Sequence, residues 1–213
     1  MTAARLGDGS REMTYTMRNR RVLLSTRPTG IAQAEHFSID ETQVRTPNEG
    51  ELLVRNSYLS VEPAMRGWIA DAGNYAAPVA IGTVMRALAV GTVIESRAEG
   101  IAAGDVVTGW FGWQMFATVP ADAVVRVVRE TDLPPSLALG VLGINGVTAY
   151  LALTQIGAPK AGETVLVSTA AGAVGSAVGQ IAGSVAKIVK LEHAWRRLDG
   201  RNDDGFQVAP FPG

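Results

Sequence analysis

The sequence predicts two structural units, a β-rich unit followed by an α/β unit. Short β-type runs separated by Gly, Pro and Asn fill the chain from Val22 to about Arg129, and such spacing is typical of a β-barrel or sandwich. Helical stretches rich in Leu and Ala begin after Pro134 and Pro135. A β-branched run at 164–168 then leads directly into a glycine-rich turn, which is typical of a parallel α/β sheet.

The β-rich unit is expected to contain several short strands bounded by turns. The run at 83–95 is interrupted by Gly91, which predicts two strands there. A turn at 47–50 precedes the run at 51–55, and Gly104 marks another turn. The runs expected to form strands are 22–24, 51–55, 83–90, 92–95, 106–107, 116–119 and 124–128.

The α/β unit is expected to begin with two helices, at 136–142 and 146–156, broken near residues 143–146. The strand at 164–168 follows a turn. An apolar stripe with spacings of 3 and 4 then predicts one helix from about 173 to 198. The alternative is that the helix ends early and residues 186–191 form a second strand. In that case Glu192 becomes a candidate for binding a ribose hydroxyl.

Composition excludes several classes of site. The chain has 213 residues, 19 Lys and Arg against 20 Asp and Glu, no Cys and two His. Near-neutral charge argues against nucleic-acid or anionic-lipid partners. Without Cys there are no disulfides or thiolate metal ligands, and His36 and His193 alone cannot form the usual zinc ligand sets. The N-terminal residues carry no apolar signal region, so we expect a cytoplasmic protein.

We divide the chain at the change of pattern. Residues 1–18 are expected to be a disordered extension, and 19–130 form the β-rich domain. Residues 131–200 form the α/β domain, and 201–213, rich in Asn, Asp, Gly and Pro, are expected to be a disordered tail. The length suits one domain and part of another.

The glycine-rich turn after the strand at 164–168 is the motif that carries chemistry. A dinucleotide pyrophosphate requires a tight turn off a strand, close backbone approach and a helix N-terminus with free N–H groups. Gly172 and Gly175 would provide the close approach, and Gly179 would allow helix-to-strand packing. Two alternatives remain: a Gly/Ala-rich helix that only packs tightly, and a membrane span, because residues 164–186 carry no charge.

Four motifs agree in order with one known family. They are LSVEPAMRG at 59–67, LALGVLGINGVTAY at 137–150, GETVLV at 162–167 and AAGAVGS at 170–176. Through them the chain resembles the zinc-independent medium-chain dehydrogenases/reductases. Within that family it is most similar to the group of the prostaglandin reductases, leukotriene B4 dehydrogenases and curcumin reductases. The resemblance extends from about residue 19 to residue 182.

The resemblance implies a GroES-like β-barrel followed by a Rossmann domain, a doubly wound parallel sheet, that holds NADPH. It implies an enone reductase, in which hydride reaches the β-carbon of an α,β-unsaturated ketone or aldehyde. By carry-over, the pyrophosphate lies against Gly172, Ala173, Val174 and Gly175. Ile144 and Thr148 lie beside the nicotinamide. Met65 lies at the substrate mouth. Core packing is the alternative role of both Met65 and Thr148. The catalytic proton donor is not assigned.

After residue 182 the resemblance ends, so the Rossmann domain is expected to be incomplete. Too few residues remain for the second half of such a fold, and the chain resembles a C-terminally truncated member. A strand at 164–168 without a neighbour would expose its edge, so we expect self-association as a homo-oligomer such as a dimer. The alternative function is a non-catalytic remnant of the barrel domain that acts only through subunit association.

Overall fold

The computed structural model describes residues 17–71 and 76–184, and the backbone of 187–190. The chain divides into two compact units, Met1–Leu139 and Gly140–Gly213. The division falls later than the change of sequence pattern near residue 130. Most of the expected N-terminal extension, the C-terminal tail and Glu192 lie outside the described residues.

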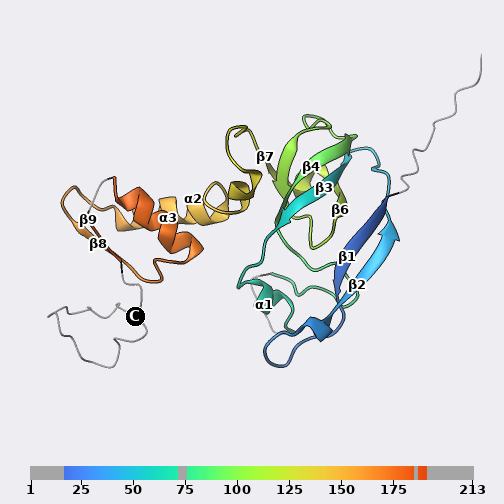
Figure 1. Ribbon diagram of the computed structural model, residues 1–213, viewed down its shortest axis with the longest axis horizontal. Coiled ribbons are helices and arrows are strands. Elements are labelled where there is room, and N and C mark those ends of the chain that lie inside the picture. Colours follow the sequence, from blue (N-terminus) through green and yellow to red (C-terminus); the bar gives the residue numbers. More distant parts are fainter. Residues whose placement is uncertain (1–16, 72–75, 185–186, 191–213) are drawn as a thin grey trace, which may run out of the picture. The chain divides into compact units, whose positions relative to one another are not determined.

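The first unit is built on a curled five-stranded antiparallel sheet (Figure 1). Its strand order is β6-β3-β4-β5-β7, and a separate antiparallel ribbon pairs β1 with β2. The first unit therefore has the architecture of a GroES-like barrel domain. Its strands are β1 (Arg18–Leu24), β2 (Phe37–Gln43), β3 (Glu51–Leu59), β4 (Ala89–Ser96), β5 (Val106–Gly109), β6 (Phe116–Pro120) and β7 (Val124–Val127).

Short helical turns connect these strands. The four-residue helix α1 (Met65–Trp68) follows β3. Three 3₁₀ turns complete the unit: η1 (Ala34–His36), η2 (Ala121–Ala123) and η3 (Pro135–Leu139).

The core lies on both faces of β3, because successive side chains of a strand point to opposite faces. Leu52 and Val54 belong to one buried cluster, with Phe111. Leu53, between them in sequence, packs in another cluster with Phe116. A third cluster contains α1 and the loops around it: Leu24, Met65, Trp68, Ile69, Val79, Met85 and Ala87.

Two expectations for this unit were wrong. Gly91 does not separate two strands: residues 83–88 precede β4, and Gly91 lies inside β4, opposite Asn56 of β3. A Cβ atom at Gly91 would lie 2.4 Å from the carbonyl oxygen of Arg55, so the glycine permits close approach of the two backbones beside a β-bulge. β2 was not expected at all, because its polar sequence FSIDETQ is largely exposed and shows no apolar run.

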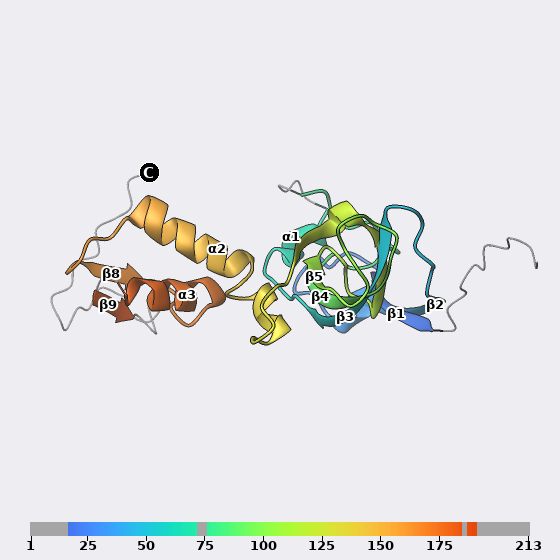
Figure 2. The same ribbon diagram turned by 90° about the horizontal axis from the view of Figure 1, so that it is seen from above.

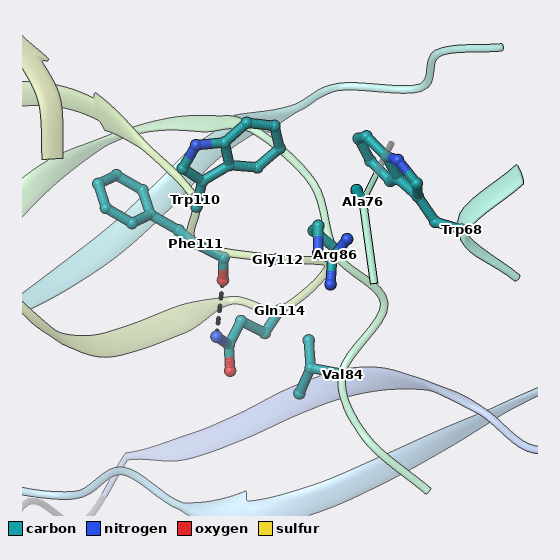
Figure 3. Close-up of a pocket in the computed structure, with 8 residues that line it drawn as sticks. All are labelled: Trp68, Ala76, Val84, Arg86, Trp110, Phe111, Gly112 and Gln114. Carbon is teal, nitrogen blue, oxygen red and sulfur yellow. Dashed lines mark hydrogen bonds between the residues drawn. The ribbon is translucent and has the colours of Figure 1, made fainter. Parts of the chain in front are cut away.

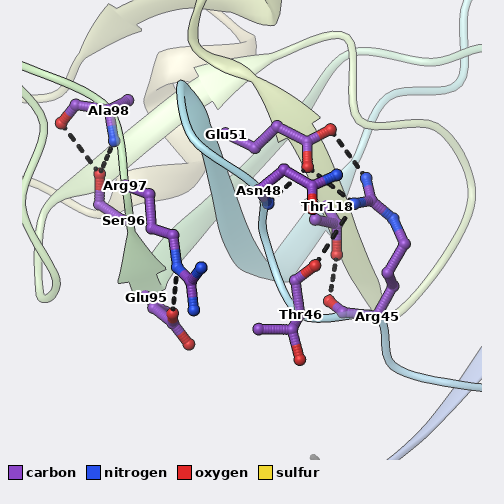
Figure 4. A network of polar contacts seen from close by, with 9 residues as sticks. All are labelled: Arg45, Thr46, Asn48, Glu51, Glu95, Ser96, Arg97, Ala98 and Thr118. Carbon is purple, nitrogen blue, oxygen red and sulfur yellow. Dashed lines mark hydrogen bonds and ion pairs between the residues drawn. The ribbon is translucent and has the colours of Figure 1, made fainter. Parts of the chain in front are cut away.

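An ion pair fixes the turn that leads into β3 (Figure 4). Arg45 donates two hydrogen bonds to the Glu51 carboxylate, at 2.7 and 2.8 Å. The backbone N–H of Asn48 donates to the same carboxylate at 2.8 Å. These contacts lower the pKa of Glu51 to about 2, with the Arg45 hydrogen bond as the largest cause. Thr118 of β6 donates to the carbonyl of Arg45, which joins the turn to the sheet.

The second unit contains a parallel strand–helix–strand arrangement. The helix α2 (Ile144–Leu151) continues into a π-helical stretch, η4 (Ala152–Gly157). Then come β8 (Thr164–Val167), α3 (Ala173–Ala182) and β9 (Lys187–Lys190). α2 and α3 lie side by side in both views of the unit (Figures 1 and 2). The expected break near 143–146 was partly wrong, because Gly146 is buried within α2.

The expectation of one helix from 173 to 198 was wrong. α3 ends at Ala182, and β9 pairs with β8 in parallel, with Val165 opposite Ile188. The alternative of a second strand in this region is therefore the one that the structure supports, and β8 does have a neighbour. The apolar stripe is not a reliable sign of one helix here, because it passes through Gly183, at which the helix ends. Beyond it, β-branched Ile188 and Val189 favour a strand.

The residues proposed as an alternative membrane span do not form one long helix. Of these residues, 164–167 form β8 and 173–182 form α3, with a turn between them. None of the helices in the described ranges is both long and apolar enough to cross a membrane.

Candidate functional site

The chain turns sharply from β8 into α3, and we call residues 169–175, which include the first residues of the helix, the glycine turn. Thr169 adopts a left-handed backbone conformation with φ of 51°. The N–H of Gly172 donates back to the Thr169 carbonyl at 2.8 Å, which closes the turn. Gly172 is the N-cap of α3, and its carbonyl accepts from Ser176 N–H at 2.8 Å. The strand thus turns into a helix within five residues.

The glycine at position 175 is required by sterics. A Cβ atom there would lie 2.4 Å from the Thr169 carbonyl oxygen and 3.0 Å from Ala170 Cα. At Gly172 the corresponding distance to the Thr169 oxygen is 3.1 Å. Any side chain at Gly175 would therefore force the turn open, whereas Gly172 leaves its own surface accessible. This is the close backbone packing that a dinucleotide fingerprint requires.

The first turn of α3 offers free donors for an anion. The N-terminal N–H groups of a helix have no partner within the helix, and no side chain caps α3. The donors of Ala173, Val174 and Gly175 lie at this end, and Gly172 and Ala173 are exposed. Together with the partial positive charge of the helix N-terminus, they fit the pyrophosphate of a dinucleotide.

The two residues expected beside the nicotinamide lie on α2. Ile144 is 57% exposed and Thr148 is also exposed. They are four residues apart, so they share one face of the helix. Because α2 packs against α3, both belong to the same unit as the glycine turn. Thr148 is therefore not a core residue of this unit.

Met65 lies elsewhere, in the first unit. Its side chain is only 6% exposed and packs with Trp68 and Met85. The structure thus places it in a core, the alternative role that the sequence left open. Its neighbour on α1, Trp68, is the residue that borders a cavity.

That cavity has a volume of about 560 Å³ and lies wholly within the first unit (Figure 3). We call it the aromatic cavity. Trp68 and Trp110 meet edge to face, with ring centroids 5.9 Å apart. The guanidinium carbon of Arg86 lies 5.5 Å from the centre of the Trp68 ring. The lining residues are Trp68, Ala76, Val84, Arg86, Trp110, Phe111, Gly112 and Gln114.

The sequence analysis did not find the aromatic cavity. Its residues come from α1, the loop before β4 and the loop between β5 and β6, which only the fold brings together. The one available signal was the density of aromatics in GWFGW, residues 109–113. Aromatic side chains with exposed faces are typical of binding surfaces. Among the described residues, no three His, Cys, Asp or Glu side chains form a group that could hold a metal ion.

Comparison with known proteins supports the description of the first unit as a GroES-like domain. A family model described as the N-terminal domain of oxidoreductase matches residues 20–127. The chain is 46% identical over 164 residues to the NADPH-dependent curcumin reductase of Escherichia coli, covering 77% of this chain and 47% of that protein. It is 36% identical over 183 residues to prostaglandin reductase 1 of Bos taurus, covering 84% and 54%.

A solved structure is similar as well. CurA from Vibrio vulnificus superimposes with a TM-score of 0.73 at 39% identity, covering 81% of this chain and 51% of that one. The chain spans about half the length of the curated relatives it matches. On these grounds the chain belongs to the medium-chain dehydrogenase/reductase family of oxidoreductases, in the group that contains the curcumin and prostaglandin reductases.

Proposed function

We propose that this chain contributes to an NADPH-dependent oxidoreductase that reduces the C=C bond of α,β-unsaturated ketones and aldehydes. It supplies the N-terminal domain and the first strand–helix–strand unit of the cofactor-binding domain. The relatives named as an NADPH-dependent curcumin reductase, a 2-alkenal reductase of Nicotiana tabacum and a prostaglandin reductase support this reaction class.

The single observation that carries the proposal is the glycine turn. Gly175 has no room for a side chain, and α3 begins at Ala173 without a side-chain cap, which leaves the N–H groups of Ala173, Val174 and Gly175 without an acceptor inside the helix. These donors would hold the pyrophosphate without any charged side chain. When bound, NADPH supplies the hydride that such a reduction needs.

The exposed face of α2 has a positioning role in this proposal. Ile144 offers an apolar surface and Thr148 a hydroxyl, one helical turn apart. An apolar side chain packs against a nicotinamide ring, and a hydroxyl orients its carboxamide by hydrogen bonding. Both side chains are exposed and therefore available for such contacts.

The test is a calorimetric titration of the 213-residue chain with NADPH and, separately, with NADH. Micromolar binding of NADPH is expected, because the donors of the glycine turn are already in place. Loss of reduced-nicotinamide absorbance with 4-phenylbut-3-en-2-one then tests turnover. Absence of binding to either cofactor would contradict a working site in this chain and favour the alternative, a barrel domain acting only by association.

We also propose that the chain forms a homo-oligomer. The second unit exposes Tyr150 at 54%, Ile156 at 85% and Leu166 at 40%, none of which the cofactor proposal uses. Exposed apolar side chains favour burial against another surface. Light scattering after size-exclusion chromatography is expected to give a dimer, and a concentration-independent monomer would contradict the proposal.

A further inference from the structure

The aromatic cavity has the size and walls of a site for a flat ligand. Its volume of about 560 Å³ lies within the roughly 300–1,000 Å³ of small-molecule sites. Trp68 and Phe111 are 3% and 1% exposed, so they form fixed walls. Trp110 is 44% exposed and keeps part of its ring surface free for stacking. A planar aromatic ring is the group that such walls accommodate best.

Arg86 has a charged side chain at this cavity, most of whose hydrogen-bond donors are unused. Its Nη1 donates one hydrogen bond, to the carbonyl of Ala77 at 3.0 Å, whereas a guanidinium carries five N–H donors. None of the ion pairs between described residues involves Arg86. Stacking on Trp68 orients the guanidinium, and an oriented guanidinium binds carboxylates in bidentate geometry.

The other polar side chain that lines the cavity is already satisfied. The Nε2 of Gln114 donates to the Phe111 carbonyl at 2.7 Å, and its Oε1 accepts from Asn19 at 3.0 Å. Among the described residues that line the cavity, Arg86 is therefore the charged group with unused donors, which points to an anionic ligand.

We propose that the aromatic cavity binds a planar aromatic ligand that carries a carboxylate. The ring stacks on Trp110, and the carboxylate pairs with Arg86. This inference rests on the proposed function in one respect, since it takes the ligand from the aryl enones, the substrate class of the proposed reaction. Arg86 is then a specificity-determining residue that favours acidic aryl enones over neutral ones.

The test compares two probes that differ only in charge, 4-(4-carboxyphenyl)but-3-en-2-one and its methyl ester. Each is titrated calorimetrically into the full chain without NADPH. The chain has no Cys, so no thiol can add to the enone. The acid is expected to bind about tenfold more tightly than the ester, since hydrogen bonds to charged groups contribute about 1.5–3 kcal/mol. Added NaCl is expected to reduce this preference. Equal affinity for acid and ester, or binding of neither, overturns the proposal.

Variants assign the effect to individual residues. Arg86→Gln is expected to remove the preference for the acid and leave the affinity for the ester unchanged. The matched control is Arg55→Gln, at an exposed position on β3 outside the cavity lining, which is expected to keep the preference. Trp110→Leu is expected to weaken both probes alike. Retention of the acid preference in Arg86→Gln contradicts the role of Arg86. The salt series on the unaltered chain tests separately whether the preference is electrostatic, and a preference that salt does not reduce contradicts an ion pair.

Failure of this inference and failure of the proposed function are distinguishable. Acid-selective binding in a chain that does not bind NADPH supports the cavity and contradicts the reductase site. NADPH binding without a preference for the acid supports the reductase site and contradicts the proposal for the cavity. Where both hold, the acid is also expected to show the lower KM of the two probes in turnover.

Discussion

The guanidinium carbon of Arg86 lies 5.5 Å from the centre of the Trp68 ring, and the indole of Trp110 meets the same ring edge to face. A cation and two aromatic rings thus border one cavity, although Trp68 and Trp110 are 42 positions apart along the chain, from 68 to 110. Attraction between a cation and an aromatic face is worth about 0.5–1 kcal/mol at exposed sites. The contact therefore contributes little to stability, but it orients the guanidinium of Arg86 and keeps its charge at the cavity.

The glycine turn predicts a steric requirement at position 175. Gly175→Ala places a Cβ atom 2.4 Å from the Thr169 oxygen and must shift the turn. The affinity for NADPH is expected to fall by about tenfold or more, equivalent to about 1.4 kcal/mol. Calorimetry is the measurement. Gly157→Ala is the matched control in the same unit, because its nearest neighbour would lie at an ordinary 3.5 Å. Unchanged affinity in Gly175→Ala would contradict the pyrophosphate role.

The pairing of β8 with β9 predicts a difference between two shortened chains. A chain that ends at Lys190 keeps β9, whereas one that ends at Ser184 leaves β8 without its partner. An unpaired strand edge promotes association with other chains. The chain ending at Ser184 is expected to form larger, concentration-dependent species in light scattering, and the chain ending at Lys190 is not. Identical behaviour of the two would argue against a stabilising role for β9.

The Arg45–Glu51 ion pair predicts how stability depends on pH. The pKa of Glu51 is lowered from 4.5 to about 2, chiefly by its hydrogen bond from Arg45. A lowered pKa in the folded state contributes stability that is present above pH 4.5 and lost as pH falls toward 2. Urea unfolding across this range is expected to show a weaker pH dependence in Glu51→Gln than in the unaltered chain. Glu49→Gln, exposed in the same turn, is the control and should keep the original dependence.

The close approach of β3 and β4 predicts a cost at Gly91. A Cβ atom there would lie 2.4 Å from the Arg55 carbonyl oxygen and 2.7 Å from Val54 Cγ1. Gly91→Ala is expected to lower the free energy of unfolding by about 1–3 kcal/mol, as overpacking does in other cores. Gly30→Ala serves as control, since no atom lies within 4 Å of its added Cβ. A denaturant midpoint for Gly91→Ala equal to that of Gly30→Ala would contradict this packing argument.

By itself, the sequence determined the features that depend on local patterns. Short apolar runs between turns predicted most strands of the first unit, since β1, β3, β5 and β6 each contain an expected run and β7 lies within one. The β-branched run followed by Gly172–Gly175 predicted the glycine turn, because a strand that turns directly into a helix needs glycine where the backbone packs closely. The motifs around it also gave the family.

The tertiary structure alone decided the features that depend on long-range pairing. Residues 187–190 lie within a helical stripe in the sequence, but Ile188 and Val189 also suit a strand, and it is the pairing of their backbone with β8 that decides between the two. The polar strand β2 is held by pairing with β1. The aromatic cavity joins three separate segments. No single stretch of sequence encodes such a surface, since distance along the chain says nothing about which side chains converge.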